Sequence, residues 1–162
     1  MAQDAGAAAQ GEELGLARLH TTIGFLLLGG WRFANSCFNQ HFKHIDITPA
    51  SYGVLLLIEE NPGCSIGSVG RAMGIAPNSI ARLVDGLVAR DLVSKRVSET
   101  DARSRQLELT VEGRKFLDLL QQHNTEYESE IVAAFGKDRH DALCALLRPF
   151  VGSAPVEELD RF

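Results

Sequence analysis

Three arginines gather around one short polar stretch of the sequence. Arg96 precedes the stretch SETDARSRQLELT, residues 98–110, while Arg103 and Arg105 lie within it. A solvated turn has no need of such a concentration of guanidinium groups. A planar guanidinium binds carboxylate or phosphate oxygens through two parallel hydrogen bonds. The pattern therefore predicts that something negatively charged sits opposite this turn.

The charge distribution points in the same direction. The net charge is -5 over 162 residues, yet residues 65–115 carry nine Lys and Arg against six Asp and Glu. Residues 1–64 carry three against six, and residues 116–162 carry four against nine. Acidic flanks repel a polyanion, so this asymmetry predicts a polyanionic partner for the basic middle alone. The alternative is chance variation over a solvated surface.

The elements that position these charges follow from apolar periodicity and helix-start signals. Apolar residues recur every three or four positions from Leu16, and Thr48, Ser65 and Thr110 are suited to cap helices that start after them. The predicted helices cover about residues 16–45, 49–60, 66–74, 77–90, 111–135 and 137–150. Two segments with period-two alternation, LVSKRV and RQLELT, predict a β-hairpin around the arginine-rich turn.

Three short helices followed by a two-stranded hairpin predict a winged helix-turn-helix within a mainly α-helical chain (α+β class). The sequence GIA, residues 74–76, provides the short turn between two of the helices. The helix from Pro77 is then the recognition helix, and its outward first turn presents side chains suited to reading base edges. The predicted contacts on the helices are Ser65, Asn78, Ser79 and Arg82. The simpler interpretation is that Asn78 and Ser79 only satisfy free amides at a helix start.

Two stretches, ITPASYGVLLLIEENPG (47–63) and NSIARLVDGLVARDLVSKRVSETDARSRQLELTVEGR (78–114), resemble the MarR family of bacterial transcriptional regulators. The resemblance extends over about residues 16–150. Its most specific element is Asp-x-Arg followed by Leu-Thr-x-x-Gly, here Asp101, Arg103, Leu109, Thr110 and Gly113. The resemblance implies that Arg103 enters the DNA minor groove, whose negative potential attracts an inserted arginine, and that Asp101 orients its guanidinium. Arg96 and Arg105 are expected to face phosphates.

The same resemblance implies a homodimer that binds a roughly palindromic operator. The long first helix and the last two helices are apolar on more than one face, which fits a dimerisation region. We predict a disordered leader (1–13), an N-terminal dimerisation helix (14–47), the winged helix-turn-helix domain (48–110), C-terminal dimerisation helices (111–151) and a tail (152–162).

The resemblance also implies that the protein binds a small aromatic or lipophilic effector. An acyl-CoA thioester is one compound of this kind. The segment GGWRFANSCFNQHFKH, residues 29–44, together with Tyr52 offers aromatic walls and polar groups for such a ligand. The candidate effector residues are Trp31, Arg32, Phe38, His41, Phe42, His44 and Tyr52. The alternative is that these aromatic residues are simply core.

The sequence is also compatible with other functions. Cys37 would be the reactive thiol of a redox sensor, and His41 with His44 would be the ligands of a zinc sensor. A winged helix can also be a protein-docking module without DNA binding. No nucleophile, phosphate-loop or metal-hydrolase motif appears, so we expect neither an enzyme nor a cofactor. Three irregularly spaced cysteines, no signal-peptide pattern and an apolar run of only residues 23–31 predict a cytoplasmic chain without membrane association.

Overall fold

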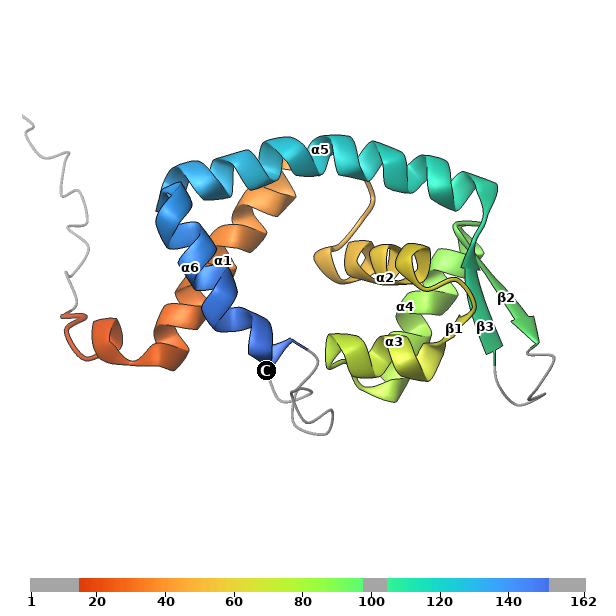
Figure 1. Cartoon of the computed structure of the whole chain (residues 1–162), viewed down its shortest axis with the longest axis horizontal. Coiled ribbons are helices and arrows are strands. Elements are labelled where there is room, and N and C mark those ends of the chain that lie inside the picture. The colour runs from red at the N-terminus through yellow and green to blue at the C-terminus, as the bar shows by residue number, and fades with distance from the viewer. Residues whose placement is uncertain (1–14, 98–104, 152–162) are drawn as a thin grey trace, which may run out of the picture. The chain divides into compact units, whose positions relative to one another are not determined.

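The computed structural model describes residues 15–97 and 105–151 (Figure 1). The described chain is mostly helical, with one small antiparallel sheet, and this confirms the predicted fold class. It divides into two compact units, residues 1–34 and residues 35–162. The predicted leader (1–13) and tail (152–162) lie outside the described residues. No helix among the described residues is long and apolar enough to cross a membrane.

In the first unit, the helix α1 begins later than the sequence predicts. A 3-10 turn, η1 (Leu19–Thr21), comes first, and α1 (Ile23–His41) starts after Thr22, whose backbone is extended. The hydroxyl groups of Thr21 and Thr22 donate hydrogen bonds to the Arg18 carbonyl, at 3.0 and 2.8 Å. Threonine hydroxyls that bond to the backbone compete with helical hydrogen bonding. The prediction of one uninterrupted helix from residue 16 to about residue 45 was therefore wrong at its start. The helix also ends earlier than predicted, at His41.

The helices of the second unit match the winged helix-turn-helix prediction. Helix α2 (Pro49–Glu60) begins as predicted, because the Thr48 hydroxyl accepts the Ser51 amide proton at 3.1 Å. Helices α3 (Ile66–Met73) and α4 (Pro77–Ala89) follow. The turn between them begins at Gly74, whose φ of 64° is a left-handed conformation that favours glycine.

The wing contains one strand more than the predicted hairpin. Strands β2 (Val93–Val97) and β3 (Arg105–Leu109) pair antiparallel, with Lys95 opposite Leu107. A two-residue strand, β1 (Cys64–Ser65), pairs with the other edge of β3, so the strand order is β1-β3-β2. Two residues are too few to show an alternating pattern, and this explains why the sequence did not predict β1.

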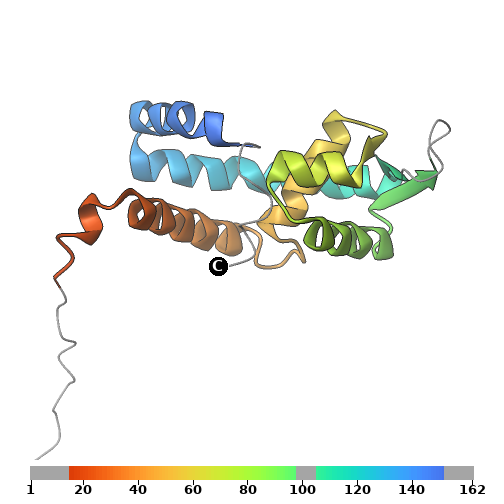
Figure 2. The ribbon, with the colours of Figure 1, turned by 90° about the horizontal axis from the view of Figure 1, so that it is seen from below.

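Helix α5 (Val111–Phe135), helix α6 (Lys137–Leu147) and the 3-10 turn η2 (Arg148–Phe150) complete the chain. Within residues 35–162, helices α2 to α4 and the sheet gather at the beginning of α5, and α6 turns back from its far end (Figures 1 and 2). The core that joins these elements is hydrophobic, and its largest fully buried side chains are Leu55, Ile58, Ile80, Leu87, Leu107, Leu117 and Leu120. This core fixes α4 against the wing.

Candidate nucleic-acid interface

Helix α4 has one buried face and one exposed face. Ile80, Val84 and Leu87 are almost completely buried, as their spacing predicts, while Leu83 is half-buried. On the other side Asn78 and Arg82 are exposed and Ser79 is half-buried. The predicted recognition residues therefore lie on the outer side of α4, where a groove of double-stranded DNA can reach them.

The first turn of α4 tests the simpler interpretation of Asn78 and Ser79. The N-cap residue is Ala76, so α4 has no side-chain cap. Neither the Asn78 amide nor the Ser79 hydroxyl forms a side-chain hydrogen bond with another described residue. The two side chains therefore do not cap the helix, and their polar groups remain available to a ligand.

Ser65 has internal partners instead. Its hydroxyl accepts the Ser68 amide proton at 3.1 Å, and the Ser68 hydroxyl oxygen accepts the Ser65 amide proton at 3.1 Å. This reciprocal arrangement is a capping box at the start of α3. The sequence predicts that Ser65 caps the helix that follows it, and the structure confirms this. The contact of Ser65 with DNA stays a prediction.

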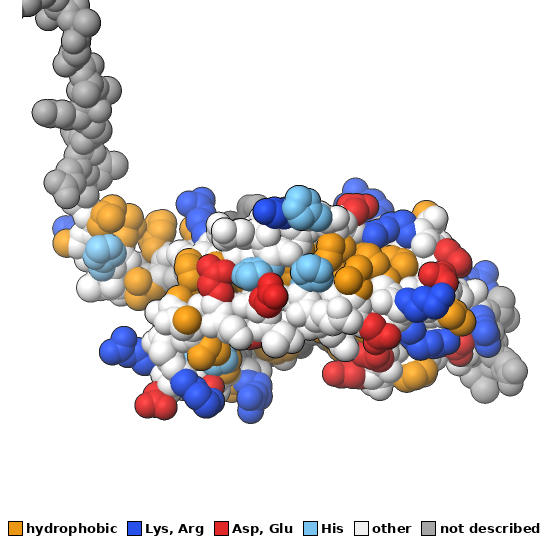
Figure 3. All heavy atoms as spheres, turned by 90° about the horizontal axis from the view of Figure 1, so that it is seen from above, with side chains coloured by type: hydrophobic (Ala, Val, Ile, Leu, Met, Phe, Trp, Pro, Cys, Tyr) orange, Lys and Arg blue, Asp and Glu red, His pale blue; other side chains and the backbone are white. Residues whose placement is uncertain are grey.

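The basic residues of the wing are partly paired with acidic residues. Lys95 forms an ion pair with Asp85 of α4, and Arg96 Nη1 lies 3.4 Å from Glu108 Oε2 on the neighbouring strand. Arg105 is exposed at the start of β3. Figure 3 shows basic and acidic side chains interspersed at the wing end of the molecule. Exposed ion pairs contribute only about 0–1 kcal/mol, so Arg96 can exchange Glu108 for a phosphate at little cost.

Asp101 and Arg103 lie outside the described residues, in the segment 98–104 that joins β2 to β3. Both flanking strands are in place, and Arg105 pairs with Val97 at the end of the ladder. The roles of Asp101 and Arg103 remain predictions from the family resemblance.

The junction of the wing with α5 explains the Leu-Thr-x-x-Gly part of the motif. Thr110 caps α5 by accepting the Gly113 amide proton at 2.8 Å, and its own amide donates to the Leu92 carbonyl at 3.1 Å. A Cβ atom at Gly113 would lie only 1.9 Å from that carbonyl oxygen. Thr110 and Gly113 therefore hold the wing tightly against the first turn of α5, and only glycine fits at this contact.

The predicted effector residues separate into two groups. Phe38, Phe42 and Tyr52 pack together in the core, with the Phe38 and Phe42 rings stacked at 4.1 Å and the Phe42 and Tyr52 ring centroids 6.0 Å apart. Tyr127 and His123 of α5 extend this aromatic cluster. Trp31 and Arg32 belong to the other unit and are exposed, and His44 is exposed as well. An effector role for any of these residues stays a prediction.

His41 joins the end of α1 to α5 through carboxylates that the sequence analysis did not single out. His41 Nε2 lies 2.7 Å from Glu130 Oε2, and His41 Nδ1 lies 3.8 Å from Glu126 Oε2. The hydrogen bond from His41, helped by one from Cys37, holds the pKa of the Glu130 carboxyl below its usual value. Glu126 and Glu130 are four residues apart and therefore share one face of α5. This spacing is common on helices, and by itself it does not identify His41 as the partner of the two carboxylates.

The thiol of Cys37 is poorly suited to redox sensing. Cys37 is buried, and its Sγ donates a hydrogen bond to Glu130 Oε1 at 3.5 Å. Burial raises the pKa of the Cys37 thiol, and the neighbouring carboxylate raises it further. Because the thiolate is the reactive form, a protonated and buried thiol reacts slowly with oxidants. For zinc, residues 15–97 and 105–151 contain no group of three His, Cys, Asp or Glu side chains arranged to hold a metal ion.

Comparison with known proteins places the winged domain among transcriptional regulators. A family model described as MarR family matches residues 45–104. The "putative transcriptional regulatory protein for hcr operon" of Thauera aromatica is 29% identical over 102 residues, or 63% of this chain, and the match spans only 61% of that relative's length. Both the family model and this relative are described as regulators of transcription, and neither is described as an enzyme.

Solved structures extend the similarity to most of the chain. The transcriptional repressor CouR bound to a 23-mer DNA duplex matches with a TM-score of 0.80 and 29% identity, covering 85% of this chain and 98% of CouR. CouR bound to p-coumaroyl-CoA matches with a TM-score of 0.77 and 27% identity, covering 85% and 97%. The winged architecture described above is therefore similar to that of CouR, which has been solved both with DNA and with p-coumaroyl-CoA.

Proposed function

We propose that this chain is a DNA-binding transcriptional regulator of the MarR family, which binds a palindromic operator as a homodimer and releases it when a small effector binds; the similarities to a MarR family model, to a regulatory protein of Thauera aromatica and to CouR support this proposal. The observation that carries the proposal is the outer face of α4. This face presents Asn78, Ser79 and Arg82 without internal side-chain partners among the described residues, on a helix whose opposite face is fixed in the core.

The proposed contacts divide by the type of DNA group that they meet. Asn78 and Arg82 on α4 read base edges in the major groove, because amide and guanidinium groups form paired hydrogen bonds with adenine and guanine edges. Arg96 and Arg105 on the wing neutralise phosphates, which positions the protein without selecting a sequence. Arg103, oriented by Asp101, enters the minor groove beside them.

Exposed apolar side chains support the proposed homodimer. From Leu16 to Trp31 no side chain is buried, and Ile23 and Trp31 are 68% and 61% exposed. In the other unit Leu146 is 70% exposed on α6. Apolar surface on this scale is unfavourable in water, and a second copy of the chain covers it in our proposal. Two-fold symmetry then presents two copies of α4 to successive major grooves.

For the effector we propose an aromatic acid or its acyl-CoA thioester, the class to which the p-coumaroyl-CoA ligand of CouR belongs. The residues that we propose as its contacts are the candidates from the sequence, Trp31, Arg32, Phe38, His41, Phe42, His44 and Tyr52. An effector releases DNA only if it favours a dimer in which the two copies of α4 no longer match the groove spacing. Zinc or redox control of the same fold, and a docking module without DNA binding, are the alternatives.

The effector proposal predicts a coupled response of fluorescence and DNA binding. Trp31 is the only tryptophan of the chain. We expect p-coumaroyl-CoA to change its emission and to weaken binding of a fluorescein-labelled operator duplex by about 5- to 150-fold, equivalent to a coupling of 1–3 kcal/mol. The duplex should weaken p-coumaroyl-CoA binding by the same factor, and free coenzyme A serves as the control.

Three outcomes would contradict the proposal in different ways. If p-coumaroyl-CoA and the parent acid leave both signals unchanged while peroxide or zinc releases the duplex, the redox or metal alternative is correct. If no duplex binds in low salt, or if the binding is insensitive to salt, the docking-module alternative is correct, because binding to phosphates weakens as salt concentration rises.

A further inference from the structure

One face of helix α6 carries four polar side chains that contact one another in series. Cys144 Sγ lies 3.6 Å from His140 Nε2, and His140 Nδ1 lies 3.1 Å from Asp141 Oδ1. Asp141 Oδ2 accepts a hydrogen bond from Lys137 Nζ at 2.6 Å. Residues three, four and seven apart share one side of a helix, so α6 itself brings these groups together. A thiol, an imidazole and a carboxylate are aligned as a nucleophile, its base and the group that orients the base.

The proton of the His140 ring is positioned by Asp141. An ionised carboxylate only accepts hydrogen bonds, so His140 Nδ1 carries the proton and Nε2 keeps a free lone pair toward the thiol. Hydrogen bonds from Lys137 and from His140 hold the pKa of the Asp141 carboxyl below its usual value. The carboxyl is therefore ionised at neutral pH, and His140 Nε2 is in place to take the thiol proton.

Cys144 has the most accessible thiol of the three cysteines. It is exposed, whereas Cys37 is buried and Cys64 is half-buried. Burial raises the pKa of both enclosed thiols, and the hydrogen bond with Glu130 raises that of Cys37 further. Because the thiolate is the reactive form, these two thiols react slowly. Cys144 alone combines access from solvent with a base at its sulfur.

This face of α6 differs from the apolar face that we assign to the homodimer. Leu146, which is 70% exposed, follows Cys144 by two residues. Two residues correspond to about 200° around a helix, so the two side chains lie on opposite sides of α6. A second copy of the chain that covers Leu146 therefore leaves the opposite side of α6 open to a reagent.

The arrangement favours a substitution over a simple addition. His140 takes the thiol proton and keeps it beside the reacting sulfur, where a leaving group can regain it. Thiolates attack the carbonyl carbon of thioesters, and the group that leaves is a second thiol that needs this proton. An acyl thioester therefore matches both the nucleophile and the base of the cluster.

We propose that Cys144 is an acyl acceptor, which takes an acyl group from a small thioester by thiol–thioester exchange. Cys144 Sγ attacks the carbonyl carbon while His140 Nε2 removes the thiol proton. A new bond forms between Sγ and the carbonyl carbon, the bond from that carbon to the original sulfur breaks, and His140 returns the proton to the leaving thiol. One thioester replaces another, so the exchange consumes no oxidant or reductant. It is a covalent modification of the protein, and it depends neither on DNA binding nor on a reversible effector.

The test incubates the full-length protein with S-phenyl thioacetate at neutral pH and follows each cysteine by peptide mass spectrometry. We expect an acetyl adduct on Cys144 before any on Cys37 or Cys64. Neutral hydroxylamine should remove the adduct, because it cleaves thioesters and leaves the amide of an acetylated lysine intact. The His140→Gln variant should slow acetylation of Cys144 by at least about tenfold, since general base catalysis typically contributes that much or more.

The pH profile separates a base from a merely structural role of His140. Between about pH 6 and 8 the wild-type rate should rise less steeply than the rate of His140→Gln, because the imidazole replaces hydroxide as the base. Asp141→Asn should show a smaller loss of rate, since the base remains but is no longer oriented. Arg139→Gln is the matched control, because Arg139 is an exposed basic residue of α6 outside the cluster. It should be acetylated as the wild type is.

Three results would overturn the inference. In the first, Cys144 of the wild type gains no adduct that hydroxylamine removes. In the second, His140→Gln is acetylated as fast as the wild type and with the same pH profile. In the third, Arg139→Gln slows the reaction as much as His140→Gln does. Circular dichroism of each variant verifies that α6 and the rest of the chain remain folded.

Discussion

Replacing Gly113 by alanine is expected to destabilise the winged domain by about 3 kcal/mol, because overpacking against a rigid neighbour forces the backbone to move. The new Cβ would lie 1.9 Å from the Leu92 carbonyl oxygen and 2.8 Å from its carbon. Both atoms belong to the backbone, so no side-chain rotation relieves the clash. Separation of the two segments also weakens the hydrogen bonds that Thr110 makes with Leu92 and Gly113.

The measurement is urea unfolding followed by circular dichroism. Gly86→Ala is the matched control, because it makes the same chemical change in a helix where the added Cβ meets open space. That variant should gain about 0.5–1 kcal/mol, since alanine is the better helix former. Equal unfolding midpoints for the Gly113 and Gly86 variants would show that the wing does not press on α5 as described.

The second large effect concerns the wing arginine that the family resemblance identifies. Arg103→Ala should weaken operator binding by about 1–3 kcal/mol without changing dimerisation, because a desolvated contact in the minor groove is lost. Asp101→Ala should show a smaller loss of the same kind, since the guanidinium remains but is no longer oriented. Fluorescence anisotropy with a labelled operator measures both.

Arg105→Ala is the control for Arg103. Arg105 is exposed on β3, and its proposed contact is with phosphate alone. Its loss should weaken operator and random duplexes about equally and reduce the slope of log affinity against log salt by about 1. An Arg103→Ala protein that binds the operator as tightly as the wild type would remove Arg103 from the interface.

Local signals were sufficient to predict most of the winged domain. Pro77 and the spacing of Ile80, Val84 and Leu87 predicted α4 and its buried face, and both are confirmed. The start of α1 was misplaced because Thr21 and Thr22 bond to the Arg18 carbonyl, a local competition that apolar periodicity does not report. The strand β1 was missed because pairing of Cys64 with Leu107 depends on tertiary contact.

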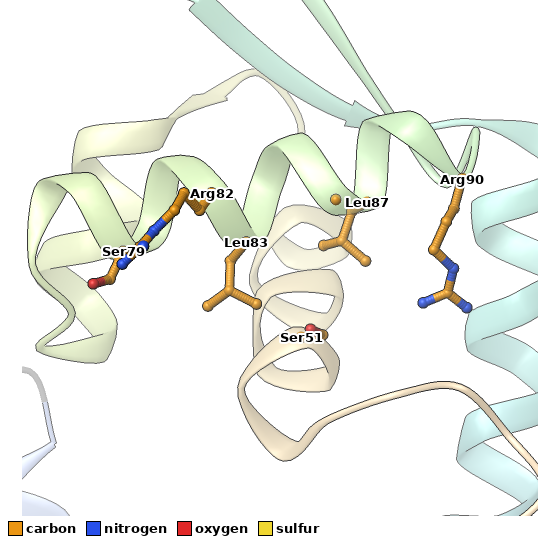
Figure 4. Close-up of a pocket in the computed structure, with 7 residues that line it drawn as sticks. Ser51, Ser79, Arg82, Leu83, Leu87 and Arg90 are labelled. Carbon is orange, nitrogen blue, oxygen red and sulfur yellow. The ribbon is translucent and has the colours of Figure 1, made fainter.

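The sequence predicted those parts of the candidate site that consist of exposed residues within a single helix. The types and positions of Asn78 and Arg82 indicated outward polar groups on α4, and the structure places them there. Partners that come from distant segments were not predictable. The bond between His41 and Glu130 joins residues 89 positions apart, and the ion pair of Arg96 with Glu108 depends on strand register. The pocket of about 450 Å³ that Ser51 of α2 forms with Ser79, Arg82 and other residues of α4 (Figure 4) likewise exists only once α2 lies against α4.

Selection of duplexes from a random library by the wild-type protein, followed by sequencing, tests the central claim most directly. Sequence-specific binding by a symmetric dimer predicts an enriched, roughly palindromic consensus with half-sites about one helical turn apart, because α4 of each protomer enters a successive major groove. A library that remains unenriched after selection, or a consensus without two-fold symmetry, would contradict the claim that this chain is a dimeric, operator-binding regulator.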